Sequence, residues 1–199
     1  MPNHLTLDEF QELCDITSRI TTRELVEYLV NQGIGHMSDG SVMFSGKDKL
    51  DTILLAIRNG CDPERLSKKI QWKDFELFTS QLIELVGYPF ERNVVLTNPR
   101  IQIDVIGFYH KIALLIDCKH RMKIQGFDIA KFSSNQITRA EIFLDKRKDI
   151  ESAIPIIVTL YEHNCNFFDR VPIVSISKFK EFLQNFALYL DRLHLIEKI

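Results

Sequence analysis

The spacing of hydrophobic residues changes part-way along the chain. Before residue 62, apolar side chains recur every three or four positions, which is typical of amphipathic helices. Further along, short apolar runs with strand patterning alternate with helical stretches. We therefore predict two parts, residues 1–61 and residues 62–199.

The first part, residues 1–61, is predicted to be a small helical region. Two of its helices span about residues 7–19 and 47–59, and between them a capping box at residues 21–24 opens a helix that ends at Gly33. The turn-rich segment 38–46 is compatible with a small ribbon, and three helices with a ribbon resemble a winged helix. Nine acidic residues against five basic ones argue against DNA contact, so packing, dimerisation or accessory binding is the favoured role.

The second part has the pattern of a mixed α/β domain. Asp62 before Pro63 predicts the start of a short helix that reaches Ile70. A helix, three strands, a helix, two strands and a helix are expected after it. This order predicts a mixed sheet with helices on both faces. The predicted ranges are 72–86, 91–96, 100–108, 111–119, 127–148, 154–160, 171–176 and from 177 onward.

Composition and charge narrow the class of protein. No apolar run approaches the roughly 18 residues of a membrane span, and the first residues lack the basic start of a signal peptide. A cytoplasmic protein without membrane contact is therefore expected. The four cysteines lie far apart and give no CxxC zinc spacing. Residues 62–150 hold 15 basic and 12 acidic residues, an excess that suits a polyanion but also occurs on ordinary surfaces.

Two neighbouring strands carry acidic residues within apolar runs. Asp104 lies in the first strand, and Asp117 and Lys119 end the second. If residues 109–110 form a two-residue hairpin turn, Asp104 and Asp117 are diagonal neighbours on one face of the sheet. The prediction depends on this turn, because a one-residue slip of the pairing would put the two acids on opposite faces.

A third acid is expected to point toward these two. Glu76 shares a helical stripe with Thr79 and Ile83, at the margin of the buried face. Three carboxylates in one place repel each other unless a divalent cation lies among them. The ordinary interpretations stay open, namely an edge-strand pair of Asp117 with Lys119 and a salt-bridged helix residue at Glu76.

These residues resemble the core of the PD-(D/E)XK nuclease superfamily, over roughly residues 72–160. The opening helix is similar in particular to that of the Mrr-like restriction endonucleases, and the archaeal Holliday junction resolvases share the wider pattern. The resemblance implies a restriction endonuclease-like mixed sheet flanked by helices, with an α-β-β-β-α-β core. Three positions depart from family patterns. Ile103 replaces the Pro of the name, Asp117 stands where Mrr-like enzymes often have Gln, and Ala140 replaces the Tyr of an exonuclease branch.

The resemblance implies a Mg²⁺-dependent endodeoxyribonuclease of the restriction, repair or recombination type, with Mn²⁺ as a substitute metal. Lys119 would contact the phosphate and the attacking water. Duplex or branched DNA is the expected partner, and a homodimer is compatible with cutting both strands. The implied catalytic residues are Glu76, Asp104, Asp117 and Lys119, and the implied metal ligands are Glu76, Asp104, Asp117 and the backbone carbonyl of Cys118.

Further residues are candidates for contacts with the nucleic acid. His120, Arg121 and Lys123 follow the second acidic strand directly, and Gln136 and Arg139 lie three apart on the next helix. Solvated side chains without such a role are the alternative at these positions. The alternative for the whole protein is a non-catalytic nucleic-acid-binding or assembly protein on a nuclease-like scaffold.

Overall fold

The computed structural model describes residues 4–38, 40–62, 65–66, 72–119, 126–163 and 165–198. Most of the short helix predicted over residues 62–70 therefore lies outside the described residues. The chain divides into two units, residues 1–61 and residues 62–199. None of the helices in the described ranges is long and apolar enough to cross a membrane.

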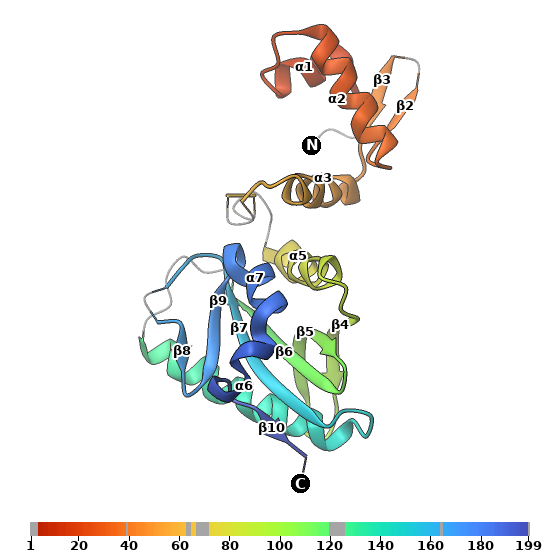
Figure 1. Ribbon diagram of the computed structural model, residues 1–199. Coiled ribbons are helices and arrows are strands. Elements are labelled where there is room, and N and C mark those ends of the chain that lie inside the picture. The colour runs from red at the N-terminus through yellow and green to blue at the C-terminus, as the bar shows by residue number, and fades with distance from the viewer. Residues whose placement is uncertain are drawn as a thin grey trace. The chain divides into compact units, whose positions relative to one another are not determined.

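Unit 1 combines helices with a small antiparallel sheet of order β1-β3-β2 (Figure 1). The apolar faces of its elements form one core that includes Leu5, Phe10, Val26 and Val42. The elements are β1 (His4–Thr6), α1 (Leu7–Leu13), α2 (Arg19–Asn31), β2 (His36–Ser38), β3 (Ser41–Met43) and α3 (Gly46–Arg58).

Two helix starts in unit 1 show how local side chains define the ends. The predicted capping box at residues 21–24 is wrong, because α2 begins earlier: the hydroxyl of Ser18 accepts a hydrogen bond from the backbone N–H of Thr21 at 3.3 Å. At α3, Ser45 and Asp48 form a reciprocal capping box. Each arrangement satisfies backbone N–H groups that a helix start otherwise leaves unpaired.

Unit 2 is a mixed α/β fold with a mixed sheet flanked by helices, which confirms the predicted fold class. Strands β4, β5 and β6 are antiparallel neighbours, whereas β6, β7 and β9 run parallel, and β8 and β10 are short additions. The elements are α5 (Trp72–Leu85), β4 (Phe90–Leu96), β5 (Ile101–Tyr109), β6 (Ile112–Lys119), α6 (Gly126–Lys146), β7 (Ser152–Thr159), β8 (Phe167–Phe168), β9 (Val171–Ser175), α7 (Ile176–Asn185), the 3₁₀ helix η1 (Phe186–Arg192) and β10 (Ile196–Glu197).

Helices cover both faces of this sheet (Figure 1). Helix α6 packs against one face, where Ala140 and Phe143 join a core with Ile106 and Leu115 of the strands. Helices α5 and α7 contact each other on the other face. Fully buried aromatic side chains such as Phe143 contribute roughly 1.5–3 kcal/mol each through burial. The order α5-β4-β5-β6-α6-β7 is the α-β-β-β-α-β order expected from the sequence, and it is consistent with a restriction endonuclease-like fold.

The hairpin between β5 and β6 turns one residue later than predicted. Tyr109 pairs with Ile112 and Val105 with Ile116, so the turn consists of residues 110–111. Moving a hairpin turn by one residue shifts the pairing by two, and the same side chains therefore remain on the same face. The ladder ends at Val105 and Ile116, one residue before Asp104 and Asp117, so these two acids lie just beyond its last pair.

Strand β5 is irregular around Asp104. Ile103 and Ile106 belong to one core cluster, although residues three apart on a regular strand point to opposite faces. The pairing of β4 with β5 omits Asn93 and Asp104, and Asn93 has a positive φ of 52°. The pairing of β5 with β6 stops at Val105. Asp104 thus lies where β5 begins to separate from β6, and irregular strand positions of this kind re-aim side chains.

Candidate functional site

The site is built at the point where the ladder between β5 and β6 ends. Oδ2 of Asp104 accepts a hydrogen bond from the backbone N–H of Cys118 at 2.8 Å. The Asp104 carboxylate therefore satisfies a backbone group next to the end of the ladder. In an extended strand the N–H and C=O of one residue point to the same side. It follows that the carbonyl of Cys118 lies on the side of Asp104.

Asp117 is a buried carboxylate with both oxygens held by cations. Its side chain is only 4 % exposed, and Nζ of Lys119 lies 2.7 Å from Oδ2. Nη1 of Arg139 lies 3.0 Å from Oδ1. A buried charge without such partners would cost several kcal/mol. The two cations therefore offset the cost of burying the Asp117 carboxylate.

Gln136 fixes the position of Arg139. Its side chain is fully buried, and Nε2 donates to the backbone carbonyl of Leu115 at 2.8 Å. Its Oε1 accepts from Nη1 of Arg139 at 3.1 Å. The hydrogen bonds thus run from β6 through Gln136 and Arg139 back to Asp117 on the same strand. These hydrogen bonds hold Arg139 beside Asp117 in the metal-free protein.

Lys119 is held from two directions. Besides its contact with Asp117, its Nζ lies 4.7 Å from the centre of the Phe132 ring of α6, which is a cation–π distance. Its side chain is 21 % exposed, so the ammonium group stands at the boundary between the packed interior and solvent.

Glu76 shares an electrostatic environment with the two aspartates. Burial raises the pKa of Glu76, and Asp104 and Asp117 raise it further, whereas Arg92 and Lys119 oppose the shift. Burial also raises the pKa of Asp104, against the hydrogen bond from Cys118, and the charge of Asp117 adds to the increase. Both shifts show that negative charge is unfavourable in this place.

These acids do not form a preformed metal cage. Among the residues that the structure describes, no three His, Cys, Asp or Glu side chains lie close enough together to hold a metal ion. Asp104 and Asp117 lie on neighbouring strands, and Glu76 interacts with them through its charge. The donors fit a hard divalent cation because they are all oxygen atoms, and burial followed by neighbouring negative charge raises the pKa of both Glu76 and Asp104.

The thiol of Cys118 belongs to the opposite face of the sheet. It donates to Oγ1 of Thr79 in α5 at 3.6 Å, while the neighbouring Asp117 contacts α6. Burial, together with the charge of Asp104, raises the pKa of this thiol well above its usual value. The neutral thiol therefore packs, as the apolar pattern of the strand predicts.

Of the residues predicted to contact nucleic acid, the structure describes Gln136 and Arg139. His120, Arg121 and Lys123 lie outside the described residues. Arg139 is 31 % exposed, so part of its guanidinium group is accessible. Gln136 is buried and hydrogen-bonded at both ends of its amide, which leaves it unsuited to direct contact and gives it a positioning role.

Sequence reasoning missed three neighbours of the site. Arg92 acts on Glu76 through its charge, Phe132 supports Lys119, and Thr79 accepts from the Cys118 thiol. A signal was present for Thr79, which shares the helical stripe of Glu76. Arg92 and Phe132 come from other elements, and only the folded arrangement shows their proximity.

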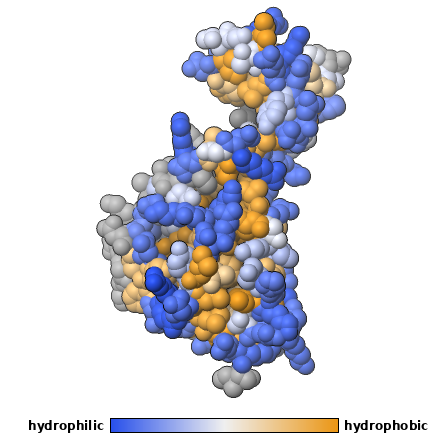
Figure 2. Space-filling model, in the orientation of Figure 1, coloured by the Kyte–Doolittle hydropathy of each residue, from blue (hydrophilic) through white to orange (hydrophobic). Residues whose placement is uncertain are grey.

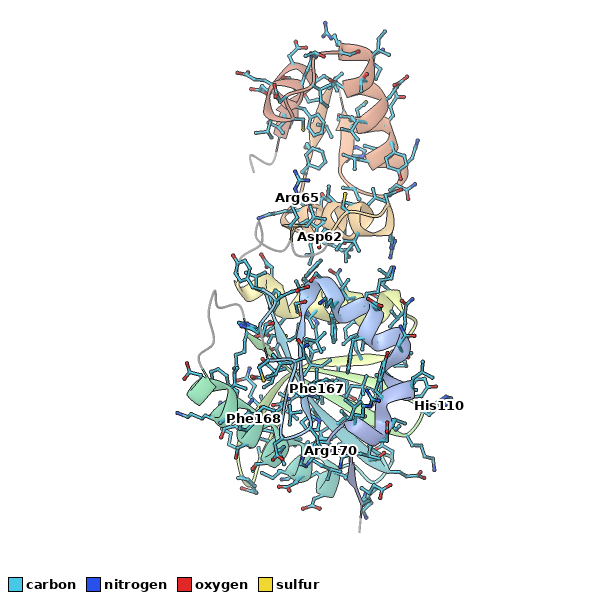
Figure 3. All side chains as sticks on the ribbon, turned by 60° about the vertical axis from the view of Figure 1, so that its left-hand side comes forward. Asp62, Arg65, His110, Phe167, Phe168 and Arg170 are labelled. Carbon is cyan, nitrogen blue, oxygen red and sulfur yellow. The ribbon has the colours of Figure 1, made fainter. Side chains whose placement is uncertain are left out.

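A separate cavity lies away from these residues. It encloses about 250 Å³ between the end of β9, helix α7 and η1, and none of the predicted site residues lines it. Phe167 of β8, labelled in Figure 3, and Tyr189 of η1 line it, and both are partly exposed. Apolar side chains also reach the surface of unit 2 on the face that carries α7 (Figure 2).

Comparisons with known proteins give similarity at the level of solved structures. No family model and no curated protein matches the chain. Protein VC1899 from Vibrio cholerae aligns with a TM-score of 0.41 and 14% identity over 95% of this chain, which spans only 46% of that protein. The protein of unknown function AF1548 aligns with a TM-score of 0.38 and 15% identity. This alignment covers 52% of the present chain and 57% of AF1548.

A third solved structure is the small subunit, R.BspD6I2, of the heterodimeric restriction endonuclease R.BspD6I. It aligns with a TM-score of 0.40 and 17% identity over 74% of this chain and 81% of that subunit.

Proposed function

We propose that this chain is a Mg²⁺-dependent endodeoxyribonuclease, a cytoplasmic enzyme that hydrolyses phosphodiester bonds in duplex or branched DNA during restriction, repair or recombination. The observation that carries the proposal is the interaction of two carboxylates on neighbouring strands, Asp104 and Asp117, with Nζ of Lys119 2.7 Å from Asp117. Two acids that repel each other inside the fold destabilise it. A role in binding a cation or a phosphate would explain why the protein has them. Cutting both strands would further favour a homodimer.

The chemistry divides among these residues. Asp104, Asp117 and the carbonyl of Cys118 would hold Mg²⁺ or Mn²⁺, with Glu76 as the further acid. Such a metal supplies charge compensation for the phosphate and lowers the pKa of water. The raised pKa of Glu76 suits a carboxylate that accepts the proton of the attacking water. The Lys119 ammonium would bind a non-bridging phosphate oxygen and stabilise the developing charge.

Nicking of supercoiled plasmid in the presence of Mg²⁺ or Mn²⁺ tests this proposal. The unmodified protein should nick, whereas Asp104→Ala and Lys119→Ala should lose activity by at least a hundredfold, as loss of a positioned charge in an active site commonly does. The matched controls are Asp145→Ala and Lys148→Ala, which change exposed residues of the same unit. Cleavage that survives both site variants would exclude this site.

One observation favours the alternative of a non-catalytic nucleic-acid-binding or assembly protein. Both oxygens of Asp117 are already held by Lys119 and Arg139, so this acid is stable inside the fold without metal. Calorimetric titration with Mn²⁺ separates the two functions. A nuclease binds the ion and loses that binding on Asp104→Ala, whereas a scaffold shows no binding to the native protein.

A further inference from the structure

Arg139 does more in this structure than face the solvent from α6. Its Nη1 is shared between two acceptors, Oδ1 of Asp117 at 3.0 Å and Oε1 of Gln136 at 3.1 Å. One nitrogen of a guanidinium group carries two hydrogens, so each acceptor receives its own. Within the described part of the chain, the recorded hydrogen bonds of Arg139 use this nitrogen alone. Its other donors remain available for a ligand.

The charges around Asp117 are nearly balanced without any metal. Glu76, Asp104 and Asp117 supply three negative charges, and Lys119 and Arg139 supply two positive charges in direct contact with Asp117. A divalent cation bound at the aspartates would lie close to the guanidinium group of Arg139, because the carboxylate of Asp117 attracts both cations. The two cations would therefore repel each other and compete.

We propose that Arg139 is an internal counter-cation: it neutralises Asp117 in the metal-free protein, competes with a divalent cation for this carboxylate, and donates to a substrate phosphate once displaced. The last step rests on the proposed nuclease function, whereas the competition does not. A guanidinium group suits both partners, because its planar donors match carboxylate and phosphate oxygens equally well. Because the Arg139 side chain is 31 % exposed, its guanidinium group can turn from Asp117 toward a phosphate at the surface.

The arrangement couples metal binding to phosphate binding. A phosphate that binds Arg139 removes a competitor from Asp117, so the metal binds more tightly when the phosphate is present. By linkage, the metal strengthens phosphate binding by the same factor. Gln136 sets the strength of this coupling, since its hydrogen bond to Leu115 holds Arg139 toward Asp117 in the free protein.

The test is the affinity for Mn²⁺, measured by isothermal titration calorimetry on the full chain. Arg139→Gln should bind Mn²⁺ more tightly than the unmodified protein, by roughly fivefold or more for a coupling of this type. Arg139→Lys retains the charge and should stay close to the unmodified protein. The matched control is Lys131→Gln, which removes an exposed positive charge from the same helix and should leave the affinity unchanged.

A merely structural role predicts the opposite sign, because loosening Asp117 would weaken metal binding. Arg139→Gln should also unfold at a lower temperature than the unmodified protein in EDTA, and Mn²⁺ should narrow the difference. Equal or weaker Mn²⁺ affinity in a folded Arg139→Gln protein overturns the proposal.

A second measurement decides the case if Arg139→Gln does not fold. In the unmodified protein, the ¹⁵N side-chain signal that disappears in Arg139→Lys should shift during Mg²⁺ titration, and a constant signal overturns the proposal. Absence of Mn²⁺ binding in every variant overturns this proposal and the nuclease function together. Tighter binding in Arg139→Gln without any plasmid nicking by the unmodified protein supports the counter-cation and overturns the nuclease function alone.

Discussion

Replacing Asp104 by Asn should stabilise the protein while it abolishes cleavage. Asn retains a side-chain oxygen that accepts from the N–H of Cys118, so the hydrogen bond at 2.8 Å has a replacement. The substitution removes the negative charge. Because the pKa of Asp104 is raised in the fold, chiefly by burial, the charged form is less stable there than in the unfolded chain.

The size of the effect follows from the repulsion between Asp104 and Asp117, which adds to the raised pKa of Asp104. Two unit charges about 6 Å apart repel by about 3 kcal/mol at an effective dielectric constant of about 20. Lys119 and Arg139 offset most of this repulsion, because both contact Asp117. We expect a net gain of about 1 kcal/mol for Asp104→Asn, or roughly 2–5 °C in Tm.

Thermal and urea unfolding in EDTA measure this gain at neutral pH. The gain should shrink as the pH falls toward the unfolded pKa of an aspartate, about 3.9, because Asp104 then becomes protonated in both states. Saturating Mn²⁺ should reverse the order, since only the unmodified protein gains stability from the ion. Asp145→Asn, at an exposed position of α6, is the control.

Two outcomes would refute this reasoning. If Asp104→Asn is less stable than the unmodified protein in EDTA, the carboxylate supports the fold and its charge is not a liability. If Mn²⁺ stabilises both proteins equally, the ion binds elsewhere.

Three further substitutions address single contacts. Gln136→Leu leaves the buried carbonyl of Leu115 without its donor and should cost about 1–3 kcal/mol in urea unfolding. Phe132→Leu removes the ring beside Lys119 and should lower kcat/KM for plasmid cleavage roughly threefold to tenfold, whereas Phe132→Tyr should retain activity. Asp48→Ala removes half of the capping box of α3 and should cost about 1 kcal/mol. Burial alone would raise the pKa of Asp48, but its hydrogen bonds with Ser45 lower it, so this contribution is present at neutral pH and is lost as the pH falls through the lowered pKa.

Matched controls separate these effects from general damage. Gln184→Leu on α7 and Phe168→Leu on β8 change exposed residues of the same types. A Gln136→Leu protein as stable as Gln184→Leu would contradict the bracing role of Gln136. Equal activity of Phe132→Leu and Phe168→Leu would contradict the support of Lys119. A stability difference between Asp48→Ala and the unmodified protein that persists unchanged at pH 3 would contradict the assigned cause.

The sequence was sufficient to predict the order of the long elements in unit 2. Apolar runs such as the one that ends at Asp117 are long enough for their periodicity to be unambiguous, and the mixed sheet follows from their order. Strands β8 and β10 were missed, since two residues carry no periodicity. The start of α2 was misplaced because Ser18 and Thr21 satisfy the same local capping rule, and only the packed helix distinguishes them.

The candidate site was predictable only in part, for a physical reason. The hairpin turn was placed one residue early, and the irregular stretch of β5 around Asp104 was not expected, because the prediction assumed a regular alternation of faces. The burial of Gln136 and the ion pair of Arg139 with Asp117 depend on how α6 lies against β6. Contacts between distant segments leave no periodic trace in the sequence, so a polar residue on a helix is read by default as solvated.

Cys118 lies between Asp117 and Lys119 of β6, a position that is variable in the motif. In this protein we expect the position to accept few larger side chains. Its sulfur contacts Oγ1 of Thr79 in α5, while its backbone N–H donates to Asp104 and its carbonyl lies on the same side. A bulkier side chain would lever the strand away from α5 and carry that carbonyl oxygen with it. The packing of the sheet against α5 would then determine where the backbone carbonyl of Cys118 lies, and no other side chain could replace that carbonyl.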